Sequence, residues 1–195
     1  MRFKNIGADN FPNWTISDIG KECDFFNGVA HENDVVERGQ YIIVNSKFVS
    51  SNGKIKKYTN TLGFELKCND IVMVMSDVPN GKAIAKCYLI DQNNKYTLNQ
   101  RICCLRTEHN SVFILNQINR NAYFLKFDDG VKQTNLRKED ILNCPLYICC
   151  KKEQEKIANF LSLIDQRIDT QSKIIEKYES LISTIRTNIF SSLHC

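Results

Sequence analysis

The chain has 195 residues, of which 43% are hydrophobic, and this composition is ordinary for a globular protein with a buried core. The formal net charge is only +4, so any surface that binds nucleic acid must be local rather than a property of the whole chain. No stretch reaches the roughly 18 uninterrupted apolar residues of a membrane span, and the first residues lack the apolar run of a signal peptide. We therefore expect a cytoplasmic protein without membrane contact.

The first 150 residues predict short strands separated by tight turns. Residues 40–50 and 54–61 flank the "SNG" sequence and predict a β-hairpin with Asn52-Gly53 at its tip. Residues 70–77 predict a buried strand that pairs with residues 82–90 across the "VPNG" turn. Residues 100–107 and 121–128 predict two further strands, because both runs are rich in β-branched, aromatic and other apolar side chains.

Helical patterns lie between and after these strands. Residues 108–119 are apolar at helical spacing, residues 135–143 predict a short helix, and residues 144–150 predict a last extended segment. From Lys151 onwards the pattern is that of one long helix. The sequence therefore predicts an α+β protein with a strand-dominated domain at residues 1–150 and a C-terminal helix at residues 151–195.

The C-terminal helix carries an apolar stripe in which spacings of four and three alternate, as in a coiled coil. Its positions are Ile157, Leu161, Ile164, Ile168, Gln171, Ile175, Tyr178, Ile182, Ile185 and Ile189. About 40 helical residues make a rod of roughly 60 Å, which is too long to be covered by one domain of this size. We expect these positions to form a dimer interface with a second copy, with Gln171 fixing the register; the alternative is a helix folded wholly onto its own domain.

These features together resemble a known family. The sequences "VKQTNLRKEDI" and "KEQEKIANFLSLIDQRID", followed by "IIEKYESL", resemble the end of a target-recognition domain and the spacer helix of type I restriction-modification specificity subunits. "NWTISDIG" is similar to the opening element of such domains, and "YTLNQRICCL" is similar to their N-Q-R strand. The chain departs from the family where a Pro commonly precedes the E-Q of the helix, because Cys149-Cys150-Lys151-Lys152 stands there.

The resemblance implies a half-subunit with one recognition domain and one spacer helix. It implies that the chain binds double-stranded DNA, reads one half of a bipartite target, and directs a methylation subunit and a restriction subunit to it. S-adenosylmethionine, ATP and Mg²⁺ are then cofactors of those partners and not of this chain. The natural partner of the helix is either an identical chain or a different half-subunit.

Candidate DNA contacts are basic and amide side chains at turns, because Lys and Arg neutralise phosphates while Asn, Gln and Arg read base edges. From Gly39 to Phe64 there are four lysines and no acidic residue. The candidates are Lys47, Asn52, Lys54, Lys56, Lys57, Asn80, Lys82, Asn99, Gln100, Arg101, Lys132 and Gln133. A solvated hairpin and a structural N-Q-R turn are the alternative interpretations.

No catalytic constellation is evident. The sequence lacks a phosphate-binding glycine loop, a nucleophile elbow, the N-P-P-[FY] of methyltransferases and a nuclease pattern. The nine cysteines show no C-x-x-C spacing, so we expect reduced thiols and no metal site. We expect a non-catalytic specificity subunit. Two other hypotheses remain: a coiled-coil adaptor that does not contact DNA, and a recognition domain detached from a fused restriction-methylation enzyme.

Overall fold

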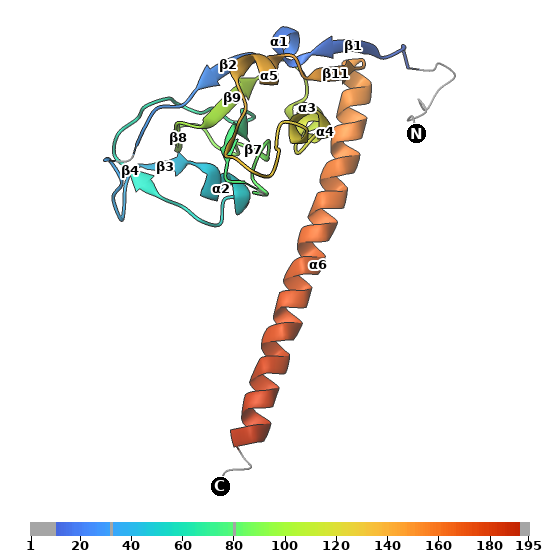
Figure 1. The fold of residues 1–195 in the computed structure, drawn as a ribbon. Coiled ribbons are helices and arrows are strands. Elements are labelled where there is room, and N and C mark those ends of the chain that lie inside the picture. The colour runs from blue at the N-terminus through green and yellow to red at the C-terminus, as the bar shows by residue number, and fades with distance from the viewer. Residues whose placement is uncertain (1–10, 32, 80, 192–195) are drawn as a thin grey trace. The chain divides into compact units, whose positions relative to one another are not determined.

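The computed structural model describes residues 11–31, 33–79 and 81–191. The chain divides into two compact units, Met1–Glu155 and Lys156–Cys195 (Figure 1). Among the described residues, the first unit holds all of the strands and the first residues of the long helix α6, and the second unit is the remainder of that helix as far as Ser191. The fold is therefore α+β, as the sequence predicts.

The main sheet of the first unit has four antiparallel strands. They are β2 (Asp24–Asn27), β9 (Ile102–Arg106), β5 (Ile71–Val74) and β7 (Cys87–Leu89), in the order β2-β9-β5-β7. All four residues of β5 are buried, which explains why this strand reads as a continuous apolar run instead of an alternating one. The predicted pairing of residues 70–77 with residues 82–90 is confirmed, since β5 and β7 are neighbours.

A second sheet holds β4 (Tyr58–Thr59), β3 (Tyr41–Val44) and β8 (Tyr96–Leu98). Strand β3 is antiparallel to β4 and parallel to β8. The core between the sheets is apolar and contains Val44, Val72, Leu98 and Ile102, all 1% exposed or less.

The predicted hairpin at residues 40–61 is wrong, although its two strands do pair. A short helix, α2 (Ser46–Ser50), follows β3 and precedes the connection to β4. Asn45 Oδ1 accepts a hydrogen bond from the N–H of Phe48, and Phe48 enters the core, so capping and burial together favour a helix here. Asn52 and Gly53 have positive φ angles of 51° and 76° and end this helix instead of forming a hairpin tip.

Two short strand pairs complete the first unit. Strand β1 (Thr15–Asp18) pairs with β11 (Pro145–Ile148), which brings the beginning of the described chain to the segment just before α6. Strand β6 (Ser76–Asp77) pairs with β10 (Thr134–Asn135). The short helices α1 (Ile19–Glu22) and α5 (Lys138–Leu142) lie beside each other. Helix α5 and strand β11 confirm the helix predicted at residues 135–143 and the extended segment after it.

Helix α3 (Ser111–Ile118) confirms the helix predicted at residues 108–119. The strand predicted at residues 121–128 is wrong, because α4 (Ala122–Leu125) is a helical turn. Asn121 Oδ1 accepts a hydrogen bond from the N–H of Tyr123, and Phe124 is fully buried. A local cap and one anchoring aromatic residue thus override the β preference of the apolar side chains.

The second unit is the long part of α6, which runs over Lys151–Ser191 and confirms the predicted C-terminal helix. Its start at Lys151 shows that the helix needs no Pro there: Cys150 C=O accepts hydrogen bonds from the N–H groups of Glu153 and Gln154. Among the described residues, no helix is long and apolar enough to cross a membrane.

Candidate functional site

The lysine-rich segment lies on α2 and on the connection that leads from it to β4. Lys47 is on the helix, and Lys54, Lys56 and Lys57 follow its end; all four side chains are exposed. Lys86 Nζ donates to the carbonyl of Ser50 at 2.8 Å and so brings a fifth cation to the helix end. The lysines predicted at a hairpin turn therefore lie on helix α2 and just after its end. We call Lys47, Asn52, Lys54, Lys56 and Lys57 the lysine surface.

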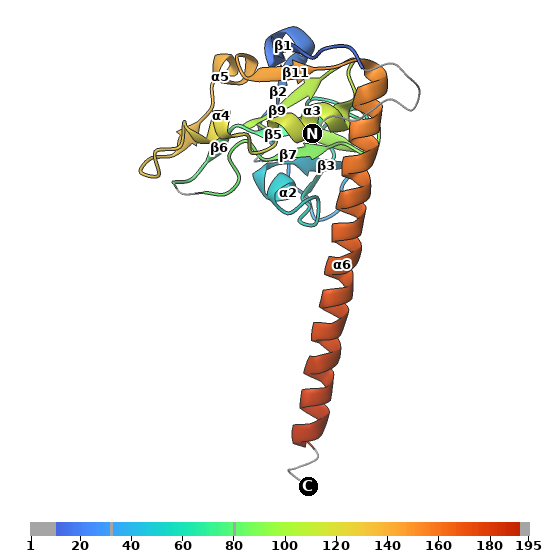
Figure 2. The same ribbon diagram turned by 90° about the vertical axis from the view of Figure 1, so that its right-hand side faces the viewer.

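Two other groups of candidates lie on neighbouring loops. Gln133 Nε2 donates to Ser76 Oγ at 2.7 Å, beside the pairing of β6 with β10 (Figure 2). Lys82 is exposed on the loop after β6, and Lys132 is exposed on the loop before β10. Asn80 lies outside the described residues. The structure thus brings two of the predicted turns together, although Ser76 and Gln133 are 57 residues apart in the chain.

Carboxylates hold both of these loops in shape. Asp77 Oδ2 accepts the N–H groups of Ala83 at 2.6 Å and Ile84 at 3.1 Å. Asp129 Oδ1 accepts the N–H groups of Val131 and Lys132, and these bonds, the one from Val131 first, lower the pKa of Asp129. Both acids therefore form turns through side-chain to backbone hydrogen bonds, and Asp129 does so next to Gly130.

The N-Q-R turn connects β8 to β9, and its backbone joins three segments. Asn99 N–H donates to Val44 C=O, Gln100 N–H donates to Val29 C=O, and Arg101 C=O accepts the N–H of Met75. Arg101 has a φ of 67°, and its side chain is exposed. The backbone contacts give this turn a structural role, whatever the three side chains bind.

A hollow of about 140 Å³ brings Lys57 and Asn99 together with residues that the sequence did not indicate. It is lined by His31, Val35, Ile43, Asn45, Lys57 and Asn99. His31 is 2% exposed and lies in a segment with several acids, so its sequence context gave no signal. Asn45 directly follows an apolar strand and is the N-cap of α2, so an N-cap pattern is the sequence signal that could have indicated it.

A larger hollow of about 280 Å³ lies between α1 and the end of β9, and two cations that line it, Lys21 and Arg106, are paired with carboxylates. Arg106 makes two hydrogen bonds to Asp70, at 2.7 and 2.8 Å, and the bond to this carboxylate raises the pKa of Arg106. Lys21 is paired with Asp18 at 2.6 Å. Because Arg106 and Lys21 are already paired within the chain, they stabilise the fold and are less free to bind a ligand.

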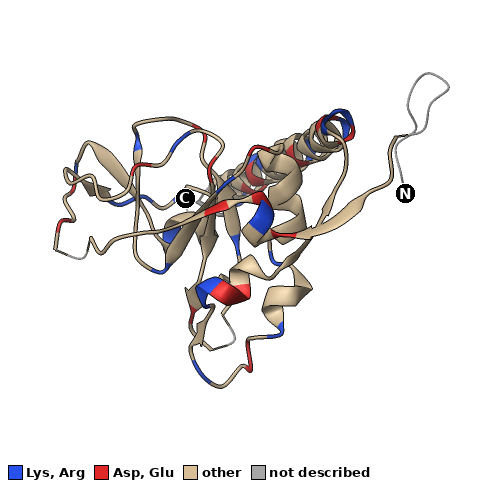
Figure 3. Ribbon diagram, turned by 90° about the horizontal axis from the view of Figure 1, so that it is seen from above, with Lys and Arg blue, Asp and Glu red and all other residues tan. Residues whose placement is uncertain are grey.

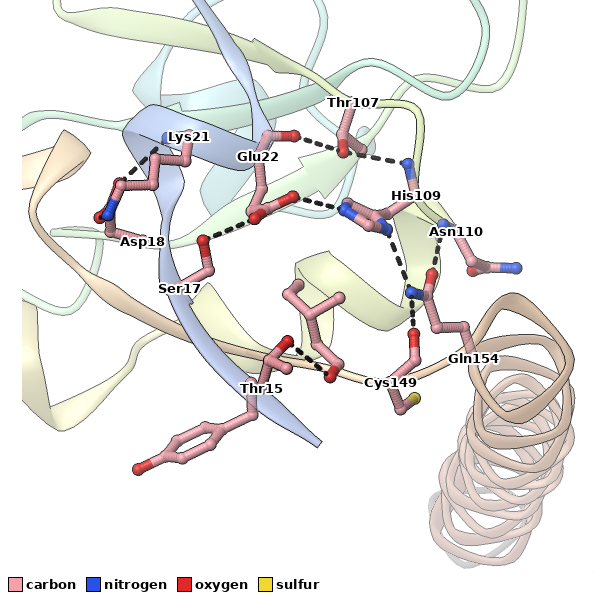
Figure 4. A network of polar contacts seen from close by, with 12 residues as sticks. Thr15, Ser17, Asp18, Lys21, Glu22, Thr107, His109, Asn110, Cys149 and Gln154 are labelled. Atoms are coloured by element: carbon pink, nitrogen blue, oxygen red, sulfur yellow. Dashed lines mark hydrogen bonds and ion pairs between the residues drawn. The ribbon is translucent and has the colours of Figure 1, made fainter. Parts of the chain in front are cut away.

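The beginning of α6 is tied into the first unit by a polar network that the sequence did not predict (Figure 4). His109 Nε2 donates to Glu22 Oε2 at 2.6 Å, and Gln154 Nε2 donates to His109 Nδ1 at 3.1 Å. Gln154 also accepts the N–H of Asn110 and donates to Cys149 C=O. The hydroxyl of Ser17 donates to Glu22, which is the largest cause of the lowered pKa of that carboxyl. We call Ser17, Glu22, His109 and Gln154 the root network.

Trp14 completes the root of the helix. Its Nε1 donates to Glu153 Oε2 at 3.1 Å, and its ring packs edge-on against Phe113. Glu153 and Gln154 are buried to 1% exposure or less. The E-Q pair on which the sequence resemblance rests is therefore a structural element of the first unit.

No other chemistry stands out among the described residues. No three His, Cys, Asp or Glu side chains are placed there to hold a metal ion. Burial raises the pKa of the Cys103 thiol to about 12, so this cysteine is a neutral core residue. Basic and acidic side chains are interspersed over the first unit, and the segment from Gly39 to Phe64, which carries the lysine surface, contains no acidic residue (Figure 3).

The predicted interface positions of α6 fall into two groups. Ile157 and Leu161 are partly buried. The other eight, including Gln171, are exposed within this chain, and the apolar ones among them are 40% to 62% exposed. An exposed stripe of this kind on one helix face is typical of a surface that another helix covers.

The profile of the "Type I restriction modification DNA specificity domain" family matches residues 13–180. The chain therefore belongs to this family, and the resemblance noted in its sequence is confirmed. Among curated proteins, none matches the chain significantly.

Solved structures share the fold. The type I restriction-modification S subunit from M. genitalium is 24% identical, with a TM-score of 0.64 over 90% of this chain and 45% of its own. The HsdS subunit from Thermoanaerobacter tengcongensis is 15% identical, with a TM-score of 0.57 over 85% and 41%. A third protein, from a study of assembly and conformational transition of the type I R-M system, is 14% identical, with a TM-score of 0.67 over 94% and 46%. The chain spans less than half the length of each.

Proposed function

We propose that this chain is the DNA-reading half of a type I restriction-modification specificity subunit. The observation that carries the proposal is the family match at residues 13–180, which covers the strand-rich unit and most of α6 together. A recognition domain and the helix that spaces it from a second domain are then the two functional parts. Each such half reads one part of a bipartite DNA target.

The lysine surface supports this function electrostatically. Exposed lysines attract phosphates, and their binding releases counterions from DNA. Lys82, Lys132 and Gln133 on the two paired loops supply further candidate contacts, and amide groups such as that of Gln133 suit adenine. We assign the lysine surface to phosphate contacts and the paired loops to a second contact region.

The second part of the proposal concerns the pairing of helix α6. Its apolar stripe is covered by a second copy of this chain or by another half-subunit of the same family. The pair then presents two recognition domains at a fixed separation on the duplex.

In this proposal the chain performs no chemistry. It directs a methylation subunit and a restriction subunit to the target. S-adenosylmethionine, ATP and Mg²⁺ act in those partners. The residues described above position and bind; none of them is arranged as a nucleophile with a base.

Reconstitution tests the proposal. The chain is mixed with a methylation subunit of a type I system, labelled S-adenosylmethionine and a random duplex pool. Methyl transfer is expected only when both proteins are present, and only at a specific sequence. Pairing through α6 without any DNA binding would instead support the adaptor hypothesis. Methyl transfer by the chain alone would support an enzyme fragment.

A further inference from the structure

Strands β6 and β10 form a two-stranded ribbon with one exposed face. Asn135 of β10 pairs with Ser76 of β6. Gln133 and Asn135 are exposed, whereas Thr134 and Leu136 are buried, so the two amide side chains lie on the outer face of the ribbon. The loops at the two strands extend from the first unit on the same side (Figure 2). The ribbon therefore presents side-chain amides at a projecting part of the first unit.

Hydrogen bonds fix the orientation of the Gln133 amide group. Asn135 Nδ2 donates to the backbone carbonyl of Gln133 at 3.5 Å, which leaves Asn135 Oδ1 to face the Gln133 side chain. Gln133 Nε2 donates to Asn135 Oδ1 at 3.3 Å and to Ser76 Oγ at 2.7 Å. We assign both Nε2 protons to these bonds. Within the part of the chain that the structure describes, Gln133 Oε1 accepts no hydrogen bond, so this exposed amide offers a ligand an acceptor and no donor.

A single acceptor distinguishes the four bases by what they present in the major groove. Guanine presents two acceptors there, and thymine presents an acceptor and a methyl group, so neither can donate to Gln133 Oε1. Adenine N6 and cytosine N4 are amino groups and can donate. The major groove is about 12 Å wide and admits a two-stranded ribbon, whereas the minor groove of undistorted B-DNA, about 6 Å wide, is too narrow. The contact that fits this ribbon is therefore a base amino group in the major groove.

Exposed cations flank the ribbon. Lys82 is on the loop after β6, and Lys132 directly precedes Gln133. Arg101 is also exposed, and its carbonyl accepts the N–H of Met75, the residue before β6. Such cations bind phosphates and set the register of a protein on the duplex, while a base contact supplies the sequence preference. The ribbon thus combines both kinds of contact.

We propose that this ribbon enters the major groove and that Gln133 Oε1 accepts a hydrogen bond from the amino group of one base, adenine N6 or cytosine N4. Ser76 and Asn135 are positioning residues, because they hold the Gln133 amide with its oxygen toward the base. The inference rests on the proposed DNA-reading function and adds one specificity-determining contact to it.

The first test is a selection from a random duplex pool with the full chain. We expect one position of the half-site at which only adenine or cytosine is enriched, and the base found there identifies which amino group is bound. Gln133→Leu removes the acceptor at similar volume. It is expected to enrich all four bases at that position and to leave the other positions unchanged.

Removal of the amino group alone tests the contact itself. At that position, purine replaces adenine or 2-pyrimidinone replaces cytosine, and fluorescence anisotropy measures binding. We expect about tenfold weaker binding by the unaltered chain, because its acceptor loses its partner in the complex. Binding by Gln133→Leu is expected to change by less than about twofold relative to the effect on the duplex itself, since the altered base pairing is common to both proteins and cancels in the comparison.

Two further variants separate base reading from other roles of this side chain. Gln133→Glu keeps an acceptor, and the Ser76 hydroxyl and the Asn135 amide can donate to its second oxygen. It is expected to weaken binding to every duplex through charge repulsion and to keep the requirement for an amino group. Lys132→Ala, at the neighbouring residue, is expected to weaken binding to every duplex by a similar factor and to leave the selected sequence unchanged.

Three results would overturn the inference while the proposed function stands: the same selected sequence for the unaltered chain and Gln133→Leu, a half-site without any position restricted to adenine or cytosine, or an equal loss for both proteins when the amino group is removed. Unchanged DNA binding by Gln133→Leu together with weaker binding of a methylation subunit would also overturn it, and would assign the ribbon to that protein. Absence of binding to any duplex by the unaltered chain would overturn the proposed function itself.

Discussion

The two units of the chain differ in how deeply their apolar side chains are buried. In the first unit, Phe48, Val72 and Leu98 are 1% exposed or less and belong to one core cluster. In α6, Ile168, Ile175 and Tyr178 are 56% to 62% exposed. The stripe on α6 is regular over more than four heptads. It therefore has the pattern of a coiled-coil core, but no second helix covers it within this chain.

The difference separates two sources of stability. The first unit has the sheets, caps and root network of a domain that folds by its own contacts. Isolated helices gain little from propensity alone, so the second unit depends on packing against something else.

Removal of residues 172–195 is expected to convert a dimer into a folded monomer. The truncation deletes the apolar positions from Ile175 onwards and leaves the first unit whole. Light scattering at tens of micromolar measures the change. Ile175→Asp within the full chain is expected to act in the same direction, and Lys177→Asp, on the opposite helix face, is expected to leave the dimer intact. A monomeric full-length chain would contradict the pairing.

Gln154→Leu is expected to lower the free energy of unfolding of the first unit by about 3 kcal/mol, because it leaves buried groups on His109, Asn110 and Cys149 without a partner. Urea unfolding measures the loss. Gln166→Leu is the matched control, since Gln166 is exposed and carries no such bonds in its side chain; its effect is expected within about 0.5 kcal/mol. Equal effects in the two variants would show that the root network contributes nothing.

Replacement of Lys54, Lys56 and Lys57 by Ala is expected to weaken binding to every duplex by a similar factor. The slope of log affinity against log salt becomes shallower by about 0.9 for each lysine that contacts a phosphate. Lys177→Ala on α6, compared with Lys56→Ala alone, controls for net charge. Unchanged affinity and slope in the triple variant would show that these lysines do not contact DNA, and would favour the paired loops with Lys82 and Lys132 as the DNA-binding surface.

The smallest expected effect concerns pH. The pKa of Glu22 is lowered in the folded chain, chiefly by the hydroxyl of Ser17 and then by His109. Its carboxylate therefore contributes stability above the unfolded pKa, and this contribution is lost as the pH falls through the folded pKa. We expect Glu22→Gln to flatten the acid side of the curve of unfolding free energy against pH. An unchanged acid limb would show that the carboxylate is not linked to folding.

The sequence predicted elements whose signal is local. The run at β5, the periodic stripe of α6 and the short helix α5 were all evident, because burial on one or both faces leaves a direct pattern in the residues. The helices α2 and α4 were missed, because a single capping Asn and one buried Phe decided against the apparent β preference. Asn52-Gly53 correctly indicated positive φ, but a helix end and a hairpin tip share that requirement.

The candidate site was harder to predict from local sequence patterns than the fold. The lysines were named from composition, and they are indeed exposed. The pairing of Gln133 with Ser76, and the meeting of His31, Lys57 and Asn99 at one hollow, depend on contacts between distant segments. No local pattern encodes such contacts. The root network was missed for the same reason, since Glu22 and Gln154 are joined only through His109.

Selection of a binding site from a random duplex pool shows whether pairing through α6 sets the geometry in which DNA is read. If two copies pair through α6 and each first unit reads DNA, a two-fold symmetric dimer must enrich an inverted repeat of one half-site with a single fixed spacing. The same selection with residues 172–195 removed is expected to enrich at most one isolated half-site. Enrichment of an undivided site by the full chain, or of half-sites at many spacings, would contradict the account.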